Sequence, residues 1–512
     1  MGIPLFFNTI AKEYGDVIDN EIPKNINGLY LDLNCAIHPC CRRVLDDNYM
    51  PSNRLFYETK MLKEINKYIV KLITITNPEL VFIAIDGVAP LAKMKQQRSR
   101  RFKHVEPNTW DTNAISPGTP FMAKIKSSID KLISSHNIFN GKKVIFSDAS
   151  IPGEGEHKIL SFIREKQPTG NNIIYGLDAD LIMLSMVSGL NNLYLLREEV
   201  IHGITKETFI TMNIDELKSI IIMDFKDRVA EKGGEAINKS QIIKDYVFIC
   251  FLLGNDFLPH LLSLDLRYSG LKIIMDIYVE TLLSINQNAI MDNKINKKFL
   301  QDFIYRLSLK EDILVKNVFA KRLALNRNFR IRADTEEEKQ KQLELNKPIL
   351  EMEEEKKIII DTPNCLDWRK RYYYHTYCKN VYDLCENYVE GLYWTAEYYF
   401  SGVKNWRWQY DHNHGPLLKD LVEWIRKNNE PNVNICNEPV SQTVQLLSIF
   451  PSRSCELIEK KYRELMTSLE SPILYMYPVD YKIDTLFKRY NWLCQPILPK
   501  IDIVKIEEII NF

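Results

Sequence analysis

Seven carboxylates in five short motifs are the residues of this chain best suited to chemistry. Three of the motifs place an Asp directly after an apolar, β-branched run, as a parallel strand does when it presents an acid at its carboxyl end. Open α/β sheets put their sites at that edge, so we expect the acids to gather there. They stand in GLYLDLN, FIAIDG, PGEGEHK, YGLDADL and LLGNDFLPH, as Asp32, Asp86, Glu154, Glu156, Asp178, Asp180 and Asp256.

Carboxylates gathered at one edge repel one another, and they are tolerated together mainly when they hold hard cations such as Mg²⁺. Two such ions, with Mn²⁺ as a substitute, can activate a water and stabilise the leaving oxygen in phosphodiester cleavage. The carboxylates therefore predict a metal-dependent nuclease. A single Asp after a strand is more often a turn or cap residue, and we interpret Asp148 in IFSDAS in that way. We interpret His157 as a supporting rather than a catalytic residue.

Strand and helix patterns alternate through the first half of the chain. This alternation predicts a doubly wound, mostly parallel α/β domain that would position the acids. A helical pattern over 244–253 ends at Gly254, where a helix commonly stops. The expected strands are Leu29–Leu33, Leu80–Ile85, Lys143–Ser147 and Asn172–Leu177, and the expected helices between them include Tyr57–Ile75 and Phe121–Ser135.

The second half is expected to be mostly helical from about Asp276 onward. Residues 334–357 are dense in Glu, Lys and Gln with a thin apolar face, so they form a solvated helix or, as we prefer, a flexible connector. Pro363 marks a fresh start, and the last part of the chain is rich in aromatic residues. We therefore expect an α/β nuclease domain over 1–330, a charged connector over 331–363 and a second region over 364–512.

Composition excludes several classes of protein. The chain has 512 residues, of which 45% are hydrophobic and 26% charged, as in a globular protein of two domains. Its formal net charge is zero, so nucleic-acid binding must come from local patches. The cluster Cys35, His38, Cys40 and Cys41 lacks a second zinc knuckle, and the cysteines are interpreted as reduced thiols. No apolar run reaches the length of a membrane span, so we expect a soluble chain.

The segment AKMKQQRSRRFK, residues 92–103, contains six basic residues and no acid. On a helix, Lys93, Gln97, Arg100 and Arg101 would share one face. Two guanidiniums, an ammonium and an amide on one stripe suit a phosphate with several free oxygens. A solvated basic face is the alternative. Because the segment closely follows Asp86, we favour a phosphate pocket beside the metal site.

Six motifs, taken in order, resemble the XRN family of 5′→3′ exoribonucleases. The similarity continues through WRKRYYY, the segment around Trp406 and Trp408, and the closing LPK, so it extends over nearly the whole chain. The resemblance implies a catalytic α/β region related to flap-endonuclease and PIN folds, and a second region that encloses the active site. The six motifs are MGIPLFF, LYLDLNCAIH, IAIDGVAPLAKMKQQRSRRF, PGEGEHKI, YGLDADLIML and LLGNDFLPHL.

The resemblance also implies roles for individual residues. The seven acids match the family's Mg²⁺-binding cluster, and the four residues of the stripe match its pocket for a 5′-monophosphate. His38 matches a residue that stacks on the leading nucleotides, and Trp406 matches a tryptophan that packs against the first base. After Trp408 the sequence departs from the family's YHYAP-like run, so stacking contacts there would differ, and the choice of Trp406 over Trp408 is open.

The function that the resemblance implies is processive 5′→3′ degradation of single-stranded RNA carrying a 5′-monophosphate, with mononucleotides as products. We expect this in mRNA decay or RNA turnover in the cytoplasm, with the nucleus as the alternative. A decapping or RNA-processing protein would be the partner, and no membrane is involved. One alternative is a flap-type endonuclease on DNA, which would share the acids. The other is a non-catalytic RNA-binding scaffold, against which the retention of all seven acids argues.

Overall fold

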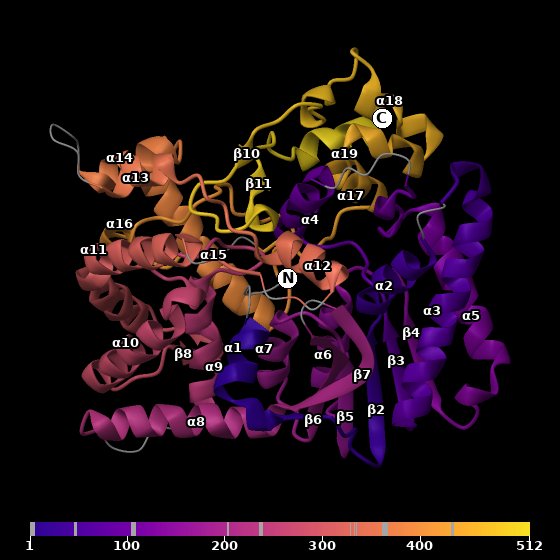
Figure 1. The fold of residues 1–512 in the computed structure, drawn as a ribbon, viewed down its shortest axis with the longest axis horizontal. Coiled ribbons are helices and arrows are strands. Elements are labelled where there is room, and N and C mark those ends of the chain that lie inside the picture. Colours follow the sequence, from indigo (N-terminus) through magenta and orange to yellow (C-terminus); the bar gives the residue numbers. More distant parts are fainter. Residues whose placement is uncertain are drawn as a thin grey trace.

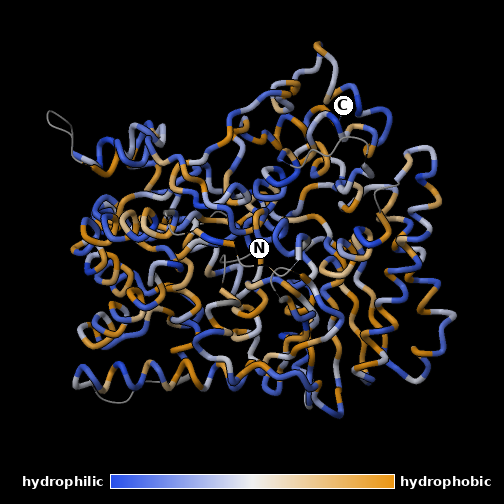
Figure 2. The backbone as a smooth tube through the Cα atoms, in the orientation of Figure 1, coloured by the Kyte–Doolittle hydropathy of each residue, from blue (hydrophilic) through white to orange (hydrophobic). Residues whose placement is uncertain are grey.

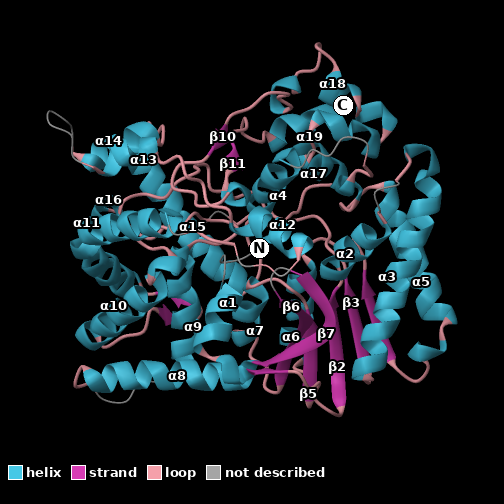
Figure 3. Ribbon diagram, in the orientation of Figure 1, coloured by secondary structure: helices cyan, strands magenta, loops and turns pink. Residues whose placement is uncertain are grey.

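The computed structural model describes residues 6–511 apart from 46–48, 104–108, 202–203, 235–238, 328, 332, 334, 361–366 and 432–434. Pro363 and the first five residues of the opening motif therefore lie outside the described residues. Within the described chain, the strands of the main sheet lie together on one side of the molecule, and helices make up most of the rest (Figures 1 and 3).

A seven-stranded sheet has the order β1-β7-β6-β5-β2-β3-β4. Strands β2 to β6 run parallel to their neighbours, while β7 pairs antiparallel with β6 and β1. Parallel neighbours need a crossover connection, which explains the alternation of strands with helices. The strands are β1 Ile18–Asp19, β2 Ile26–Asp32, β3 Leu80–Ala84, β4 Lys143–Ser147, β5 Asn171–Tyr175, β6 Leu193–Ile201 and β7 Ile204–Asn213.

The predicted doubly wound, mostly parallel domain is confirmed, and the four expected strands correspond to β2, β3, β4 and β5 with small shifts at their ends. The expected helices correspond to α3 and α5. Strands β6 and β7 were not expected, because they follow one another antiparallel and carry charged residues on a side that is not fully covered. The helices of this part are α1 Phe6–Glu13, α2 Asn34–Val44, α3 Arg54–Thr76, α4 Leu91–Lys103, α5 Pro120–Ser135, α6 Gly155–Lys166 and α7 Asp180–Met186.

Both faces of the central strands are buried. In β2, Leu29 and Leu31 belong to a hydrophobic cluster with α2, α3 and α5, whereas Tyr30 belongs to a cluster with α6 and α7 on the opposite face. Strands covered on both sides have near-continuous apolar sequences, which is the pattern that precedes Asp32 and Asp86. The acids therefore follow strands that packing holds rigidly.

After β7 the described chain is mostly helical, beginning at Ile214 and so earlier than expected. Figure 2 shows alternating hydrophilic and hydrophobic residues along α8 at the margin of the molecule. No helix among the described residues is long and apolar enough to cross a bilayer. These helices are α8 Ile214–Glu231, α9 Lys239–Cys250, α10 Gly270–Ile285, α11 Lys297–Arg327, α12 Glu336–Asn346, α13 Glu353–Ile359, α14 Trp368–His375, α15 Val381–Phe400, α16 Leu418–Lys427, α17 Gln442–Ile449, α18 Glu464–Thr467 and α19 Ile503–Asn511.

The expected flexible connector is wrong over much of its length, since α12 and α13 are helices within it. Helix α12 is the solvated helix that was the alternative. Helix α13 is packed: Ile358 and Ile359 are buried in a small hydrophobic cluster, and Glu355 forms a buried ion pair of 2.8 Å with Arg322 of α11. The apolar end of the charged segment therefore attaches it to the helices beside it. The domain limits at 330 and 363 stay predictions.

Helix α4 is surrounded by residues from the second half of the chain. The backbone N–H of Leu91 donates to the carbonyl of Trp406 at 2.9 Å. On other sides of the helix, Arg98 donates to the carbonyl of Pro499 at 2.7 Å, and Lys95 donates to the carbonyl of His412 at 3.0 Å. The helix predicted to carry the basic stripe is thus held between the sheet and the helical region.

Candidate active site

Strand register brings the acids to one edge of the sheet. Asp32 is the last residue of β2 and lies opposite the end of β3, with Asp86 two residues beyond that end. Strand β5 ends almost level with β2, and Asp178 and Asp180 follow it. The carboxyl ends of parallel neighbours meet at the same edge, so the four acids converge without help from distant contacts.

The start of α6 adds two further acids. Glu154 stands at the N-cap of α6 and Glu156 in its first turn, where carboxylates also suit the helix dipole. Gly155 between them lies against the strand ends: its N–H donates to Asp86 Oδ1 at 2.7 Å, and a Cβ there would lie 2.6 Å from Asp32 Oδ1. The PGEGEHK motif therefore needs glycine at this position to bring both glutamates onto the sheet edge.

Burial and mutual repulsion raise the pKa values of several members of this cluster. Burial first, then the charges of neighbouring carboxylates, raise the pKa values of Asp32 and Glu156 well above their ordinary range. Burial likewise raises the pKa of Asp86, and it raises that of Asp180 to about 6. Charges of all seven predicted acids act within this one group. The structure thus brings together the complete predicted set.

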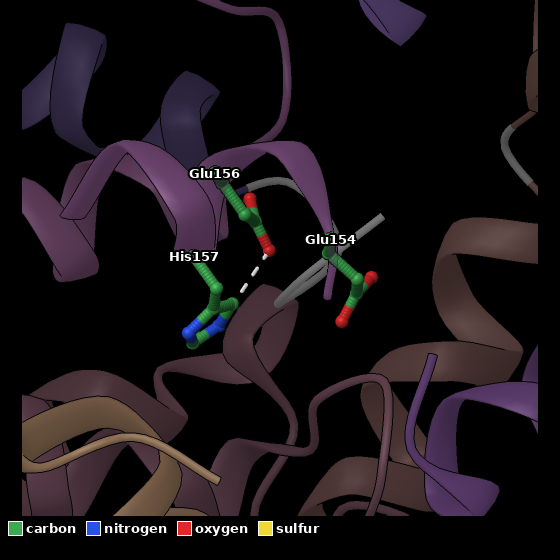
Figure 4. A group of neighbouring side chains, drawn as sticks. All are labelled: Glu154, Glu156 and His157. Atoms are coloured by element: carbon green, nitrogen blue, oxygen red, sulfur yellow. Dashed lines mark ion pairs between the residues drawn. The ribbon is translucent and has the colours of Figure 1, made fainter. Parts of the chain in front are cut away.

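This donor set fits a hard divalent cation. Ligand atoms of Glu154, Glu156 and His157 lie within 4.8 Å of one another, and Figure 4 shows Glu156 and His157 side by side with Glu154 beside them. Among the described residues, the buried atoms Asp32 Oδ1, Asp180 Oδ1 and His157 Nε2 have no hydrogen-bond partner. A Mg²⁺ ion takes oxygen ligands and would relieve the repulsion that raises these pKa values. The predicted acids would hold it, with His157 at the margin.

Lys93 joins the acid cluster directly. Its Nζ lies 2.6 Å from Glu154 Oε1 and 2.8 Å from Asp256 Oδ2, and its side chain is largely buried. Burial acts to raise the pKa of Asp256, but the charge and hydrogen bond of Lys93 bring that pKa below its ordinary value. The ammonium of Lys93 connects α4 to the carboxylates, and its predicted role as a phosphate ligand stays a prediction.

The other members of the stripe lie where a phosphate pocket requires donors. Arg101 and Gln97 are each only 7% exposed, whereas Arg100 is exposed. Arg101 donates from Nη2 to Ser116 Oγ at 2.8 Å, but its Nε and Nη1 and the Oε1 of Gln97 have no partner among the described residues. Burial, followed by the charge of Arg100, lowers the pKa of Arg101 to about 9. A buried guanidinium with unused N–H groups is suited to bind an anion.

His38 lies on α2 beside this pocket. Burial, and then the charges of Arg100 and Arg101, lower its pKa to about 3, so the imidazole is neutral at physiological pH. A neutral ring beside guanidiniums can stack on a base without competing for the phosphate. Its closeness to the stripe agrees with the predicted stacking role, which stays a prediction.

The two tryptophans near the stripe differ in their surroundings. Trp408 stacks on Trp394 with ring centroids 5.1 Å apart, and its Nε1 donates to Glu390 at 3.4 Å. Trp406 is partly exposed, and its carbonyl accepts the hydrogen bond that begins α4. Trp408 is also partly exposed, so the choice between the two for contact with a base stays open.

Tyr398 and Asn34 are site residues that the sequence analysis missed. The Tyr398 hydroxyl, on α15, donates to Glu154 Oε2, and its ring lies 3.7 Å from the His157 ring between centroids. Asn34 donates from Nδ2 to Asp86 Oδ2 at 2.8 Å and accepts the Asp86 N–H at 3.1 Å. Asn34 follows Asp32 in the LDLN motif, which was a usable signal. Tyr398 has no local signal, because it stands 244 residues from its partner.

Asp148 is confirmed as a turn residue. It follows β4 as Asp86 follows β3, but its Oδ1 accepts the N–H of Ser150 at 2.7 Å and its Oδ2 pairs with Lys126. Burial acts to raise the pKa of Asp148, yet these hydrogen bonds lower it below the ordinary value. The direction of its pKa shift is thus opposite to that of Asp86, although the two sequence contexts look alike.

Two family models match this chain. A family model described as the XRN 5′-3′ exonuclease N-terminus matches residues 1–108 and 103–199, and one described as the Xrn1 helical domain matches residues 236–365 and 364–511. Because the second model alone matches more than half of the chain, the chain belongs to the XRN 5′→3′ exonuclease family. The predicted family is therefore confirmed.

Individual relatives are named as exoribonucleases. The chain is 30% identical to human 5′-3′ exoribonuclease 1 over 98% of its own length and 33% of that protein. It is 27% identical to 5′-3′ exoribonuclease 2 of Arabidopsis thaliana over 98% of its length and 66% of that protein. This chain thus spans from a third to two thirds of the length of these two relatives. A solved structure of the T5 D15 protein co-crystallised with metal ions covers 57% of this chain and 88% of that one at 9% identity, with a TM-score of 0.28, which supports no argument.

Proposed function

We propose that this protein is a divalent-metal-dependent 5′→3′ exoribonuclease that acts processively on single-stranded RNA carrying a 5′-monophosphate and releases mononucleotides. The single observation that carries this proposal is the direct contact between the acidic cluster and the basic helix. A buried acid cluster suited to Mg²⁺ meets a basic helix through Lys93, with 2.6 Å separating its Nζ from Glu154 Oε1. Cleavage and recognition of a terminal phosphate would therefore occur a short distance apart.

The basic helix supports selection of the 5′ end. Arg101 has unused N–H groups in a buried position, and Gln97 is buried beside it. A terminal monophosphate offers several free oxygens to such donors, whereas a 5′-hydroxyl has no charge to bind. The second half of the chain packs around α4, so a cap or triphosphate would meet protein rather than solvent. His38 and Trp406 would hold the leading bases by stacking, which tolerates any sequence.

The acids would bind the metal ions of the cleavage site. When bound, two Mg²⁺ ions would lower the pKa of a water and offset the charge of the departing 3′ oxygen. Asp32, Asp86, Asp178 and Asp180 would provide ligands from the sheet edge, while Glu154, Glu156 and Asp256 would provide them from the neighbouring segments. Asn34 and Tyr398 orient two of these carboxylates through hydrogen bonds. RNA turnover in the cytoplasm, with an RNA-processing protein as partner, belongs to the same proposal.

The test compares one single-stranded RNA with a 5′-monophosphate, a 5′-triphosphate or a 5′-hydroxyl, with Mg²⁺ and with EDTA. The expected result is Mg²⁺-dependent release of mononucleotides from the monophosphate alone, and none from a variant with Asp178→Ala and Asp180→Ala. Cleavage that ignores the 5′ end, or that prefers a DNA flap tested alongside, would favour an endonuclease. No metal-dependent cleavage of any substrate would favour a scaffold.

A further inference from the structure

A second surface of α4 lines a large cavity, and most of the residues on its wall have no role in the proposed function. The cavity has a volume of about 1550 Å³, larger than the ~300–1,000 Å³ of ordinary small-ligand pockets. Ala92, Lys95, Gln96 and Ser99 line it from the helix, and residues 482–489 and 492–501 line it from the opposite side. These helix positions point away from Gln97 and Arg101, so most of the cavity wall on α4 lies on a different side of the helix from the phosphate pocket, and Arg100 lies where the two meet.

The cavity reaches the acid cluster. Asp256 and Arg100 are part of its wall, and Asp256 Oδ2 accepts a hydrogen bond of 2.8 Å from Lys93. The same Lys93 ammonium pairs with Glu154, so the cavity meets the acid cluster at Asp256 and lies one side chain away from Glu154. His38 and Trp406, which would hold the incoming RNA, do not line it. The cavity therefore approaches the site from a side other than the one proposed for the substrate.

The charge of the cavity favours an anion. Nine Lys and Arg residues and five Asp and Glu residues line it. Three of those acids are already paired, Asp256 with Lys93, Asp484 with His414 and Asp411 with Lys500. Several of the cations, in contrast, have carbonyl oxygens as partners: Arg98 bonds Pro499, and Lys103 bonds Trp492 at 3.3 Å. A carbonyl satisfies a donor without cancelling its charge, so the walls keep a positive field.

We propose that this cavity binds the nucleoside 5′-monophosphate released by each cleavage and is the path by which that product leaves. The proposal rests on the proposed function. A released mononucleotide carries about −1.5 to −2 charge near neutral pH, which matches the walls. Trp492, 37% exposed, offers a ring surface in the same cavity for a base of any type. A processive enzyme keeps the remaining RNA bound between cleavages. A released nucleotide that left through a separate cavity would not have to displace that RNA.

Two variants test the path without touching the proposed catalytic or phosphate-binding residues. Ser99→Trp places a bulky ring on the α4 wall of the cavity. Lys103→Glu with Lys482→Glu reverses two charges on the wall. The matched controls lie on exposed helix surfaces elsewhere: Ser127→Trp for the first, and Lys298→Glu with Lys316→Glu for the second. Thermal melts of all four establish that each is folded.

Two rates distinguish an effect on product release from an effect on the cleavage step itself. Release of the first nucleotide is measured with enzyme in excess over 5′-monophosphate RNA, and the steady rate of successive cleavage is measured on a long RNA. If product departs through the cavity, both test variants keep the first cleavage and lower the steady rate about threefold to tenfold, since product release then limits turnover. The controls keep both rates. An unchanged steady rate in both variants, or an equal fall in both rates, would overturn the proposal.

Binding of uridine 5′-monophosphate provides a second measurement that does not depend on RNA cleavage. It is measured by equilibrium dialysis in an Arg101→Ala background, where the phosphate pocket is weakened. Binding there should persist and should fall when Lys103→Glu and Lys482→Glu are added. If it falls while wild-type protein fails to cleave RNA, the cavity binds nucleotides and the proposed function is wrong. If wild-type protein cleaves RNA but no such binding is found, the cavity assignment alone is wrong.

Discussion

The acid cluster and the basic stripe lie side by side, yet they are held in different ways. Four of the acids follow strands β2, β3 and β5, which are buried on both faces and aligned by register, and two more stand where α6 begins beside the strand ends. The stripe lies on a single helix whose first hydrogen bond and several side chains depend on residues more than 300 positions later. The sheet therefore fixes the position of most of the acids, whereas the packing of the two halves of the chain fixes the position of the stripe.

This difference determines which part of the site a given substitution should affect. A change at a sheet-edge acid should remove chemistry and leave the selection of RNA ends intact. A change in the contacts around α4 should alter selection or turnover while the acids stay in place. Lys93 is the exception, because it contacts both parts. The predictions below separate the two parts, beginning with the largest effect.

Replacing Asp178 and Asp180 together by Asn should abolish cleavage, with a loss of about a thousandfold or more, because two ligands of the metal site lose their charge. Binding of 5′-monophosphate RNA in the presence of Ca²⁺ should remain within a few fold. The measurement is cleavage rate and RNA affinity on the same preparation. Asp148→Asn is the control, since that carboxylate is held in a turn by Ser150 and Lys126 and should retain activity.

Replacing Arg101 by Ala should lower the preference for 5′-monophosphate over 5′-hydroxyl RNA about tenfold to a hundredfold, the worth of a buried charge-assisted hydrogen bond. The Mg²⁺ concentration for half-maximal rate should stay unchanged. Competition between the two RNAs in one reaction measures the preference directly. Arg426→Ala, an exposed arginine on α16, serves as control, and an unaltered preference in Arg101→Ala would remove Arg101 from the phosphate pocket.

Replacing Tyr398 by Phe should raise the Mg²⁺ concentration needed for half-maximal rate by about tenfold, because hydrogen-bonded supports of metal ligands typically matter by that much. The ring and its stacking on His157 and Trp394 are kept, so only the hydrogen bond to Glu154 is lost. Excess Mg²⁺ should restore the rate. Tyr393→Phe on the same helix is the control, and a defect that excess Mg²⁺ does not restore would indicate a purely structural role.

The smallest effect concerns stability in the absence of metal. The pKa of Asp180 is raised from 3.8 to about 6, mainly by burial, so proton binding favours the folded state. That contribution is complete below the unfolded pKa of 3.8 and is lost as pH rises through 6. Asp180→Asn should therefore raise the melting temperature in EDTA at pH 7 by about 1–3 °C, with the difference vanishing toward pH 4.

The substitution Asp148→Asn should change the melting temperature at pH 7 in the opposite direction. The pKa of Asp148 is lowered by its hydrogen bonds, against burial, so its charged form stabilises the fold above the ordinary pKa of 3.8. Its replacement should lower the melting temperature at pH 7 and matter less as the pH falls through the native pKa. Thermal melts of both variants across pH 4–8 compare the signs of the two effects, and melts of Asp148→Asn continued below pH 3.8 follow the loss of its effect. Shifts of equal sign in the two variants would contradict the contrast between the two sites.

The sequence predicted the gathering of six of the acids because each follows its own strand or stands at a helix start, and parallel register aligns the strand ends. Asp256 carries no such signal, since it follows the end of a helical segment. The sequence also predicted helix α4 and the residues that share one of its faces, because helical spacing depends only on residues that are close in the sequence. It could not predict that Lys93 would bond acids, that Tyr398 would support Glu154, or that α13 would be packed. Those facts depend on segments brought together only by the complete fold. The hairpin of β6 and β7 was missed because its alternation is broken by charges at the sheet's edge.

The bond between Leu91 and Trp406 also bears on how the protein is made. Chains leave the ribosome amino terminus first, and domains tend to fold as they emerge. The sheet is complete once about 213 residues have been made, whereas the N–H of Leu91 meets its partner only when Trp406 has been made, and Arg98 meets its partner only at Pro499. The contacts around α4 are therefore completed later than the sheet, and the proposed end-binding pocket would form after the strands that precede most of the acids.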